Sequence, residues 1–318
     1  MAARKTPATK TSASKSTATK APTSAPAKAP SKAATKAPHK SPAKSAPKSA
    51  AKKTTAKSAN KATLVARAAK TAVKRAKASP DGFPGFRPAA LTFLRGLKKN
   101  NRKEWFEEHR DDYEREIKLR LLALIEEVDV LLAGFAPEII GSPRRSMFRI
   151  YRDVRFSKDK SPYKTHAASW FYHRDGGSSV GSEAAHGGAG FYFHLAPEGT
   201  FLGGGIWMPP RPVLNRIRQN IADDHEGFED IILSAGFKKR FGELETEHML
   251  TRPPRGFAPD HPAGDWLRYQ SFTAGRAVTP EEYLSPKLPQ ILAKHYEAMT
   301  PLIRWLNEAS GLKPSTMR

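Results

Sequence analysis

The side chains best suited to chemistry lie close together between Arg149 and His166, in the segment RIYRDVRFSKDKSPYKTH. Guanidinium groups present paired N–H donors that match phosphate and carboxylate oxygens. The segment therefore predicts a site for an anionic, phosphate-bearing small molecule or nucleotide, with Asp153 holding the arginines in register and His166 carrying a proton at its edge. The residues predicted to bind the anion are Arg149, Arg152, Arg155, Lys160 and Lys164.

The same charges also fit a purely structural role. If residues 146–156 form a strand, Arg149, Asp153 and Arg155 share one face and can pair with one another. Exposed ion pairs of this kind add little stability. The sequence leaves this ladder of ion pairs open as an alternative to the anion site.

Histidines supply further candidates. His261, between Asp260 and Pro262, is a second candidate proton carrier, although the same tripeptide also suits a turn. His173 and His194 are expected to face each other across a hairpin. No HExxH or similar spacing is present, so no metal ligand is predicted. The predicted catalytic residues are His166, His261 and Asp153.

The composition of the chain excludes several kinds of reactive group and cofactor site. The chain has no cysteine, which excludes thiol nucleophiles, disulfides and cysteine-bound metal centres. It has no P-loop or dinucleotide-binding glycine pattern, and its serines lack a nucleophile elbow, so the cofactor stays unknown. No apolar run approaches the roughly 20 residues that span a bilayer, so no membrane partner is expected.

The placement of these residues depends on the elements that carry them. Apolar residues at helical spacing predict helices over 89–98, 101–134, 209–223, 226–234 and 285–308. Alternating aromatic segments predict strands over 146–156, 167–173, 190–196, 200–208, 237–241 and 267–273, with a turn near Gly275. Their Trp and Phe side chains are expected to fill the core, in preference to the alternative of a platform on which bases stack. This order predicts one α+β domain over residues 81–318, a mainly antiparallel sheet packed against helices.

Residues 1–80 differ sharply from this body. They hold 20 Lys and Arg with no Asp or Glu, whereas residues 81–318 hold 34 basic and 31 acidic residues. Low hydrophobicity with one sign of charge predicts a long disordered basic tail. Such a polycation binds phosphate backbones by releasing counterions, without reading base sequence. The predicted nucleic-acid-binding residues are Lys28, Lys32, Lys36, Lys40, Lys44, Lys48, Lys52 and Lys53.

The Lys/Ala/Pro composition of the tail resembles that of linker-histone tails and of basic tails on bacterial nucleoid proteins. The resemblance implies an association with nucleic acid, in a cytoplasmic, nucleoid-associated protein or a nuclear one if the source is eukaryotic. A spacer with no dedicated partner and a mitochondrial transit peptide are the alternatives. The prolines and the scarcity of Arg argue against the transit peptide.

The body also resembles a known family. The pattern Arg149-x-x-Arg152-Asp153-x-Arg155-Phe156-x-x-Asp159-Lys160-x-x-Tyr163 is similar to the signature of a bacterial and fungal family of unknown function. The stretches Phe191–His194, Gly203–Pro209 and Asp260–Asp265 are similar to that family too, and the resemblance covers about residues 83–309. It implies no particular activity.

Two functions of different classes follow. The first is a nucleic-acid-tethered protein whose body binds an anionic, phosphate-bearing ligand through residues 149–166, with catalysis left open. The second is a non-enzymatic architectural module that uses the tail on nucleic acid and the body for protein contacts. A concave pocket lined by the charged residues favours the first, and mutual pairing on a flat surface favours the second.

Overall fold

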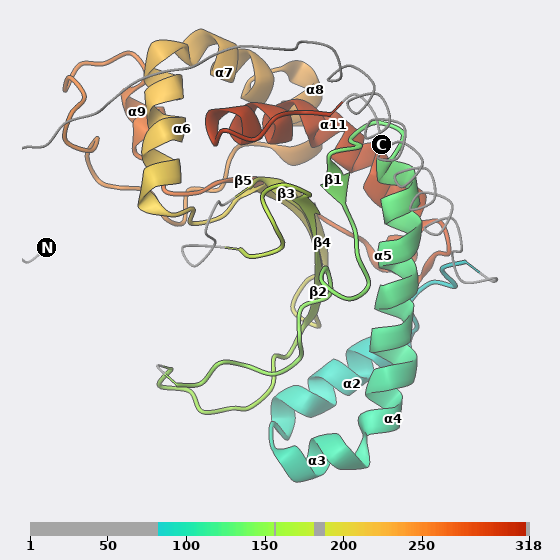
Figure 1. Cartoon of the computed structure of the whole chain (residues 1–318). Helices are drawn as coiled ribbons and strands as arrows, with labels where there is room; N and C mark the ends of the chain where they lie inside the picture. The colour runs from blue at the N-terminus through green and yellow to red at the C-terminus, as the bar shows by residue number, and fades with distance from the viewer. Residues whose placement is uncertain (1–81, 156, 181–187, 316–318) are drawn as a thin grey trace, which may run out of the picture. The chain divides into compact units, whose positions relative to one another are not determined.

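The computed structural model of the chain describes residues 82–155, 157–180 and 188–315, so the predicted basic tail lies outside the described residues. The described part is built on a five-stranded antiparallel sheet with the order β1-β2-β3-β4-β5 (Figure 1). The strands are β1 (Ile139–Ile140), β2 (Ala167–His173), β3 (Gly190–Leu195), β4 (Phe201–Ile206) and β5 (Phe272–Ala277). Together with the helices that pack on it, this sheet confirms the predicted α+β class.

A helical region precedes the sheet. Its first helix begins at Pro88, whose fixed φ suits a first turn, and its last turn carries Lys98 and Lys99. The helices that follow run almost without interruption and bury an apolar side that includes Ile117 and Leu121. The elements are α2 (Pro88–Lys99), α3 (Lys103–Glu108), α4 (Arg110–Asp112), the π-helix η1 (Tyr113–Lys118) and α5 (Leu119–Leu132).

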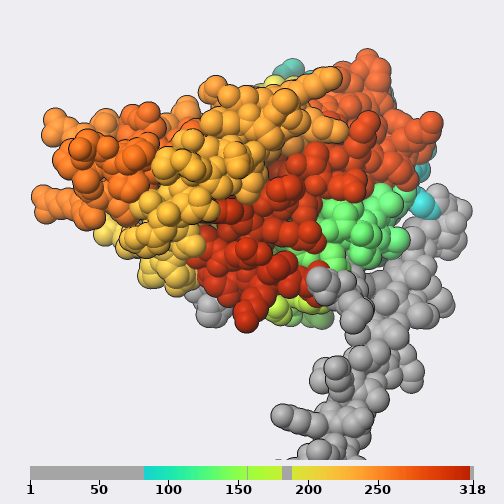
Figure 2. Space-filling model, turned by 90° about the horizontal axis from the view of Figure 1, so that it is seen from above, coloured from blue at the N-terminus to red at the C-terminus, as the bar shows by residue number. Residues whose placement is uncertain are grey.

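The long helix α11 (Leu288–Ala309) covers one face of the sheet, beside α5. Strand alternation points Phe171 and Phe191 to this face, where Tyr296 stacks on Phe191 with ring centroids 4.5 Å apart. In the space-filling view, the red surface of α11 lies beside the orange surface of the helices before β5 and the green surface near the end of α5 (Figure 2). The apolar core lies between the sheet and these helices.

A helical block separates β4 from β5. In this block, residues 235–241 form a helix, so the strand predicted over 237–241 is wrong. Ser234 caps that helix by accepting a hydrogen bond from the Phe237 N–H, and the buried Phe237 and Phe241 stand four residues apart, which is helical spacing. The elements are α6 (Arg211–Asp223), α7 (His225–Ile232), α8 (Ala235–Phe241) and α9 (Gly264–Leu267), with α10 (Pro280–Leu284) after β5.

Two further strand predictions need correction. Residues 146–155 form no strand but contribute isolated bridges at Met147 and Tyr151. The arm that faces Tyr151 contains Pro162, which has no N–H to extend a ladder. The strand predicted over 267–273 starts at Phe272 instead and runs on through Gly275, where a turn was expected.

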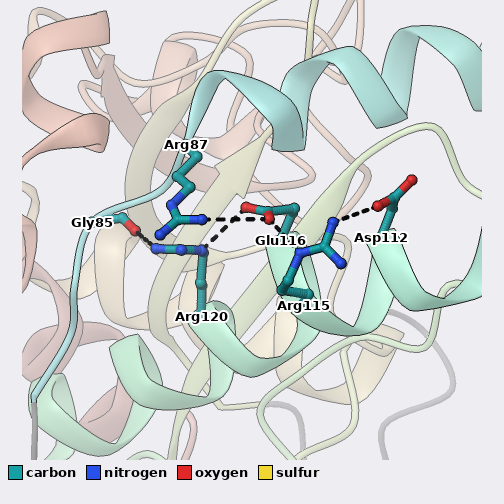
Figure 3. Close-up of polar contacts among 6 residues, drawn as sticks. All are labelled: Gly85, Arg87, Asp112, Arg115, Glu116 and Arg120. Atoms are coloured by element: carbon teal, nitrogen blue, oxygen red, sulfur yellow. Dashed lines mark hydrogen bonds and ion pairs between the residues drawn. The ribbon is translucent and has the colours of Figure 1, made fainter.

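A buried carboxylate anchors the first described residues to the helical region (Figure 3). Glu116 is 3% exposed and lies among three arginines. Its carboxylate is 2.8 Å from Nε of Arg115 and 3.5 Å from Nε of Arg120. Nη1 of Arg87 lies 3.8 Å away, and Arg120 also donates to the Gly85 carbonyl. One charge therefore joins the segment before α2 to the π-helix and α5.

Candidate functional site

The sheet face opposite α11 carries a cavity of about 580 Å³. A register row crosses the strands here, pairing Trp170 with Tyr192, Tyr192 with Gly203, and Gly203 with Gly275. Gly203 and Gly205, which line the cavity, leave this part of its floor free of side chains. A Cβ on Gly203 would lie 2.7 Å from the Ala274 carbonyl oxygen, so the close approach of β4 and β5 also requires glycine there.

Aromatic side chains form the walls of this cavity. Trp170 and Tyr192 project from β2 and β3, and Phe148 meets the Tyr192 ring edge-on with centroids 6.1 Å apart. Trp207, 49% exposed, adds a further indole to the lining. The Trp and Phe side chains of the strands were expected to fill the core. Phe171 does so, but Trp170 points to the cavity, as does Tyr192 opposite it.

The ammonium group of Lys164 lies beside these aromatic side chains. Nζ of Lys164 lies 5.2 Å from the centroid of the Phe148 ring, within range of a cation–π interaction. Burial, and then the positive charge of Arg149, lower the pKa of Lys164. Within residues 82–155, 157–180 and 188–315, no carboxylate forms an ion pair with this side chain. Lys164 is therefore a partly buried cation able to receive an anionic group.

Two histidines stand next to this lysine. The rings of His166 and His194 have centroids 4.5 Å apart, and Nδ1 of His194 makes a 3.0 Å hydrogen bond with the Tyr192 hydroxyl. Burial, and then the charge of Lys164, lower the pKa of His166. Burial, and then His166, lower that of His194 to about 4. Both imidazoles are consequently neutral at pH 7, and His166, which lines the cavity, can accept a proton.

A second cavity, of about 430 Å³, adjoins the first, because Lys164 and His166 line both. Its lining is mainly polar and includes Lys98 and Arg152. Arg152 forms an ion pair with Asp159, which lines the same cavity. The structure thus places an aromatic cavity and a polar, basic cavity on the two sides of Lys164 and His166.

An irregular hairpin positions these residues. Its arms are held together where the Lys164 N–H donates to the Ile150 carbonyl at 2.7 Å. The Asn101 side chain donates to the Tyr163 carbonyl at 2.9 Å and accepts from the Tyr163 N–H at 3.0 Å. The Tyr163 ring stacks on Phe106 of α3, with centroids 4.3 Å apart. Packing against the helical region therefore fixes Lys164, one residue further on.

The other charged residues predicted for the anion site lie outside both cavities. Asp153 and Arg155 pair with each other at the surface, with side chains 42% and 76% exposed. That pairing lowers the pKa of Asp153 to about 2. Nζ of Lys160 donates to the Val154 carbonyl at 2.9 Å, and Arg149 is exposed. Of the predicted set, the structure brings together Arg152, Lys164 and His166, and it gives Asp153 and Arg155 the contacts of the ladder alternative.

The remaining histidine predictions fall elsewhere. Nδ1 of His261 accepts from the Ala263 N–H at 3.1 Å, so this ring stabilises the turn before α9, and it lines none of the three cavities found among the described residues. His173 and His194 do not face each other. Nε2 of His173 contacts the Lys313 carbonyl, whereas His194 pairs with Ala168, five residues before His173 in β2.

Glu245 and Trp207 are among the lining residues of the aromatic cavity that the sequence predictions missed. Glu245 accepts a 2.8 Å hydrogen bond from the Thr273 hydroxyl, and Trp207 follows β4 directly. The run Gly203-Gly204-Gly205 was the available signal, because glycine inside a strand marks a place where side chains are missing from a sheet face. Glu245 had no comparable signal, since it lies in an irregular segment brought in by the fold.

In the part of the chain that the structure describes, no three His, Cys, Asp or Glu side chains are grouped to hold a metal ion. No helix among the described residues is both long and apolar enough to cross a membrane. The eight lysines predicted to bind nucleic acid, from Lys28 to Lys53, lie outside the described residues.

Comparison with known proteins gives one match. Residues 89–305 match the family model described as "Conserved hypothetical protein (DUF2461)". Those residues include the whole sheet and the hairpin that carries Lys164 and His166. No curated protein and no solved structure matches the chain.

Proposed function

We propose that this chain, which belongs to the DUF2461 family of conserved hypothetical proteins, binds a small organic anion that carries an aromatic ring, of the nucleotide class. The observation that supports the proposal is the junction at Lys164 and His166, where the aromatic and the basic cavity share the same two side chains. A ligand with a planar apolar part and an anionic part matches these two surroundings at once.

Each part of such a ligand has a counterpart. A planar ring in the larger cavity can stack on Trp170, Tyr192 or Trp207, and stacking of a base on an aromatic side chain contributes about 1–3 kcal/mol. The anionic group would lie at Lys164, with Lys98 and Arg152 beyond it in the smaller cavity. Lys164 is the main contact, because Arg152 already shares its guanidinium with Asp159.

His166 is the group for proton transfer at this junction. It is neutral at pH 7 and lines both cavities, so it can take a proton from water or from a ligand hydroxyl. Incubation with a nucleotide and chromatography of the products separates an enzyme from a binding module. An enzyme loses turnover in His166→Gln and keeps its affinity, whereas a binding module yields no product with either protein.

Calorimetry on the full chain tests the binding proposal. Adenosine monophosphate should bind roughly 10-fold more tightly than either inorganic phosphate or adenosine, since only the nucleotide fills both cavities. Lys164→Met should weaken nucleotide binding roughly 10-fold or more, because a charge-assisted contact is lost. Lys160→Met is the matched control, since that lysine bonds the Val154 carbonyl outside the cavities. Equal affinities of Lys164→Met and the unaltered chain would overturn the proposal.

We also propose that residues 1–80 tether the chain to nucleic acid. The support is the charge distribution, with 20 of the 54 basic residues and none of the 31 acidic ones in this segment. Gel-shift titration of duplex DNA over several salt concentrations tests it on the full chain. Replacing the eight predicted lysines by Gln should flatten the log–log salt dependence by roughly 0.9 per lost phosphate contact. An unchanged slope, or a preference for one DNA sequence, would contradict the proposal.

A further inference from the structure

A third cavity lies at the beginning of α6, away from Lys164 and His166. Its volume is about 430 Å³. The lining includes Met208, Pro209, Arg211, Leu214, Arg218 and Leu250, which belong to the first two turns of α6, the residues before it, and the segment before α9. It shares no lining residue with the cavities at Lys164. Among the described residues, no acidic side chain lines it, although two arginines do.

Arg218, in this lining, is a buried cation without a counter-charge in the described part of the chain. The residue is only 6% exposed. Nη2 donates to the Tyr269 carbonyl at 2.9 Å, but the buried Nε has no hydrogen-bond partner among the described residues. No described carboxylate forms an ion pair with it, and burial lowers its pKa. A buried cation without a counter-charge is costly, and proteins ordinarily pair such groups with anions.

The helix end adds a second source of positive potential at the same place. α6 has 13 residues, its N-cap is Pro210, which provides no side-chain cap, and its first turn carries no acidic residue. The N–H groups of a first turn and the helix dipole attract anions. Arg211 is exposed and lines the cavity from this turn. Met208 has φ +43°, an unusual value for a residue other than glycine, and it lies in the same lining.

We propose that this cavity binds the acid group of a small molecule, a carboxylate or a phosphate, with Arg218 as its buried guanidinium ligand. The acid would supply the counter-charge that Arg218 lacks, and it would accept from Nε as well as from the N–H groups of Arg211 and Val213, since Pro212 has none. Leu214 and Leu250 suit a short aliphatic part of the same ligand. This site does not depend on nucleotide binding at Lys164.

The test uses the full chain with inorganic phosphate and succinate as probes, against chloride at equal ionic strength. Each probe should raise the unfolding midpoint by roughly 2–4 °C at concentrations well above its dissociation constant. Hydrogen–deuterium exchange should slow in peptides that cover α6, which separates this site from anions held elsewhere on the chain. A larger effect of succinate identifies a carboxylic acid as the ligand class, and a larger effect of phosphate identifies a phosphate ester.

Three variants make the test specific. Arg218→Met should abolish the slowing of exchange in α6 and reduce the rise in the unfolding midpoint, and Arg211→Met should weaken the binding of both probes at α6 about 3- to 10-fold. If Arg218→Met fails to fold, Arg211→Met decides, because Arg211 is exposed and has no described fold contact. Arg216→Met is the matched control: it removes one arginine from the same helix, but that side chain bonds the Ser310 carbonyl and lies outside the cavity.

Two results would overturn the proposal. Either neither probe slows exchange in α6, or Arg211→Met and Arg216→Met show the same response to the probes. Lys164→Met should keep the full effect at α6, so loss of nucleotide binding in that variant leaves this result unaffected. Conversely, a chain that binds no nucleotide but shows protection of α6 supports this site alone.

Discussion

The rings of His166 and His194 are tilted by 31° to each other with centroids 4.5 Å apart, in a surrounding that lowers the pKa of both. His194 is held further by the Tyr192 hydroxyl and by the Phe201 ring, 4.6 Å from its own ring centroid. Protonation of either imidazole places a charge in this partly buried pair and opposes protonation of the other. The folded state therefore favours the neutral form of the pair, so its stability depends on pH.

The first prediction follows from this pair. The pKa of His194 is about 4 in the folded chain and near 6.5 when unfolded, so the unfolded chain binds the extra proton first as pH falls. The stabilisation is fully present above pH ~6.5 and is lost as pH falls towards 4. Between pH 7 and pH 5, urea unfolding should show a loss of about 1–2 kcal/mol from this histidine.

His194→Phe should flatten that pH dependence, because the ring that resists protonation is gone. His225→Gln, which changes a histidine at the start of α7, is the control and should keep the original slope. Equal slopes for His194→Phe and the unaltered chain would show that the pair does not control acid stability.

The second prediction concerns the buried carboxylate of Glu116 (Figure 3). Glu116→Gln leaves the guanidinium groups of Arg115 and Arg120 beside an uncharged amide, and Arg120 is itself buried. Loss of one partner from a buried ion pair should lower the free energy of unfolding by roughly 2–4 kcal/mol. Glu108→Gln, at an exposed position of α3, should change it by less than about 0.5 kcal/mol. Similar denaturation midpoints for the two variants would contradict the expectation.

The third prediction concerns Asn101, whose amide makes both hydrogen bonds to the Tyr163 backbone. Asn101→Ala removes both and should lower the free energy of unfolding by about 1–3 kcal/mol. Because Tyr163 positions Lys164, calorimetry should also show weaker nucleotide binding. Asn220→Ala is the control, since that amide bonds the Arg216 carbonyl one turn earlier in α6. Unchanged affinity in Asn101→Ala would mean that the hairpin keeps its place without this contact.

The fourth prediction concerns the floor of the aromatic cavity. Gly203→Ala puts a methyl group 2.7 Å from the Ala274 carbonyl oxygen, so β4 and β5 must separate. The cost should be roughly 1–3 kcal/mol, measured by thermal or urea unfolding. A Cβ on Gly199 meets no atom within 4 Å, so Gly199→Ala serves as the control and should be nearly neutral. Comparable stabilities would indicate that the strands can move apart freely.

Most of the fold could be predicted from local patterns. The strand 167–173 matches β2 residue for residue, because the consecutive aromatic residues Trp170, Phe171 and Tyr172 favour a strand there. Helix α11 was predicted within three residues at each end, since its apolar spacing persists over 22 residues. The error at 237–241 came from weighing its two phenylalanines as strand residues, although Ser234 and the four-residue spacing already favoured a helix.

The candidate site was less predictable. Lys164 and His166 stand out as ionisable residues close to the aromatic strand 167–173, and both line the two cavities. Density of charge, however, does not show which guanidinium groups will pair with neighbours, and Arg155 pairs with Asp153 at the surface. Arg218 gave no signal, because its position in an amphipathic helix is ordinary and only the packing of 208–211 and 250 around it makes it unusual.

The helical block between β4 and β5 begins and ends at facing positions of the sheet, since Ile206 pairs with Phe272. The chain can thus gain or lose residues in the loop 243–262 without altering the strand ladder on either side. An insertion of one residue within β4 has a different effect, because it moves every later side chain of the strand to the opposite face. Gly203 and Gly275 would then no longer meet. Length variation among relatives should therefore concentrate in this loop and spare the strands.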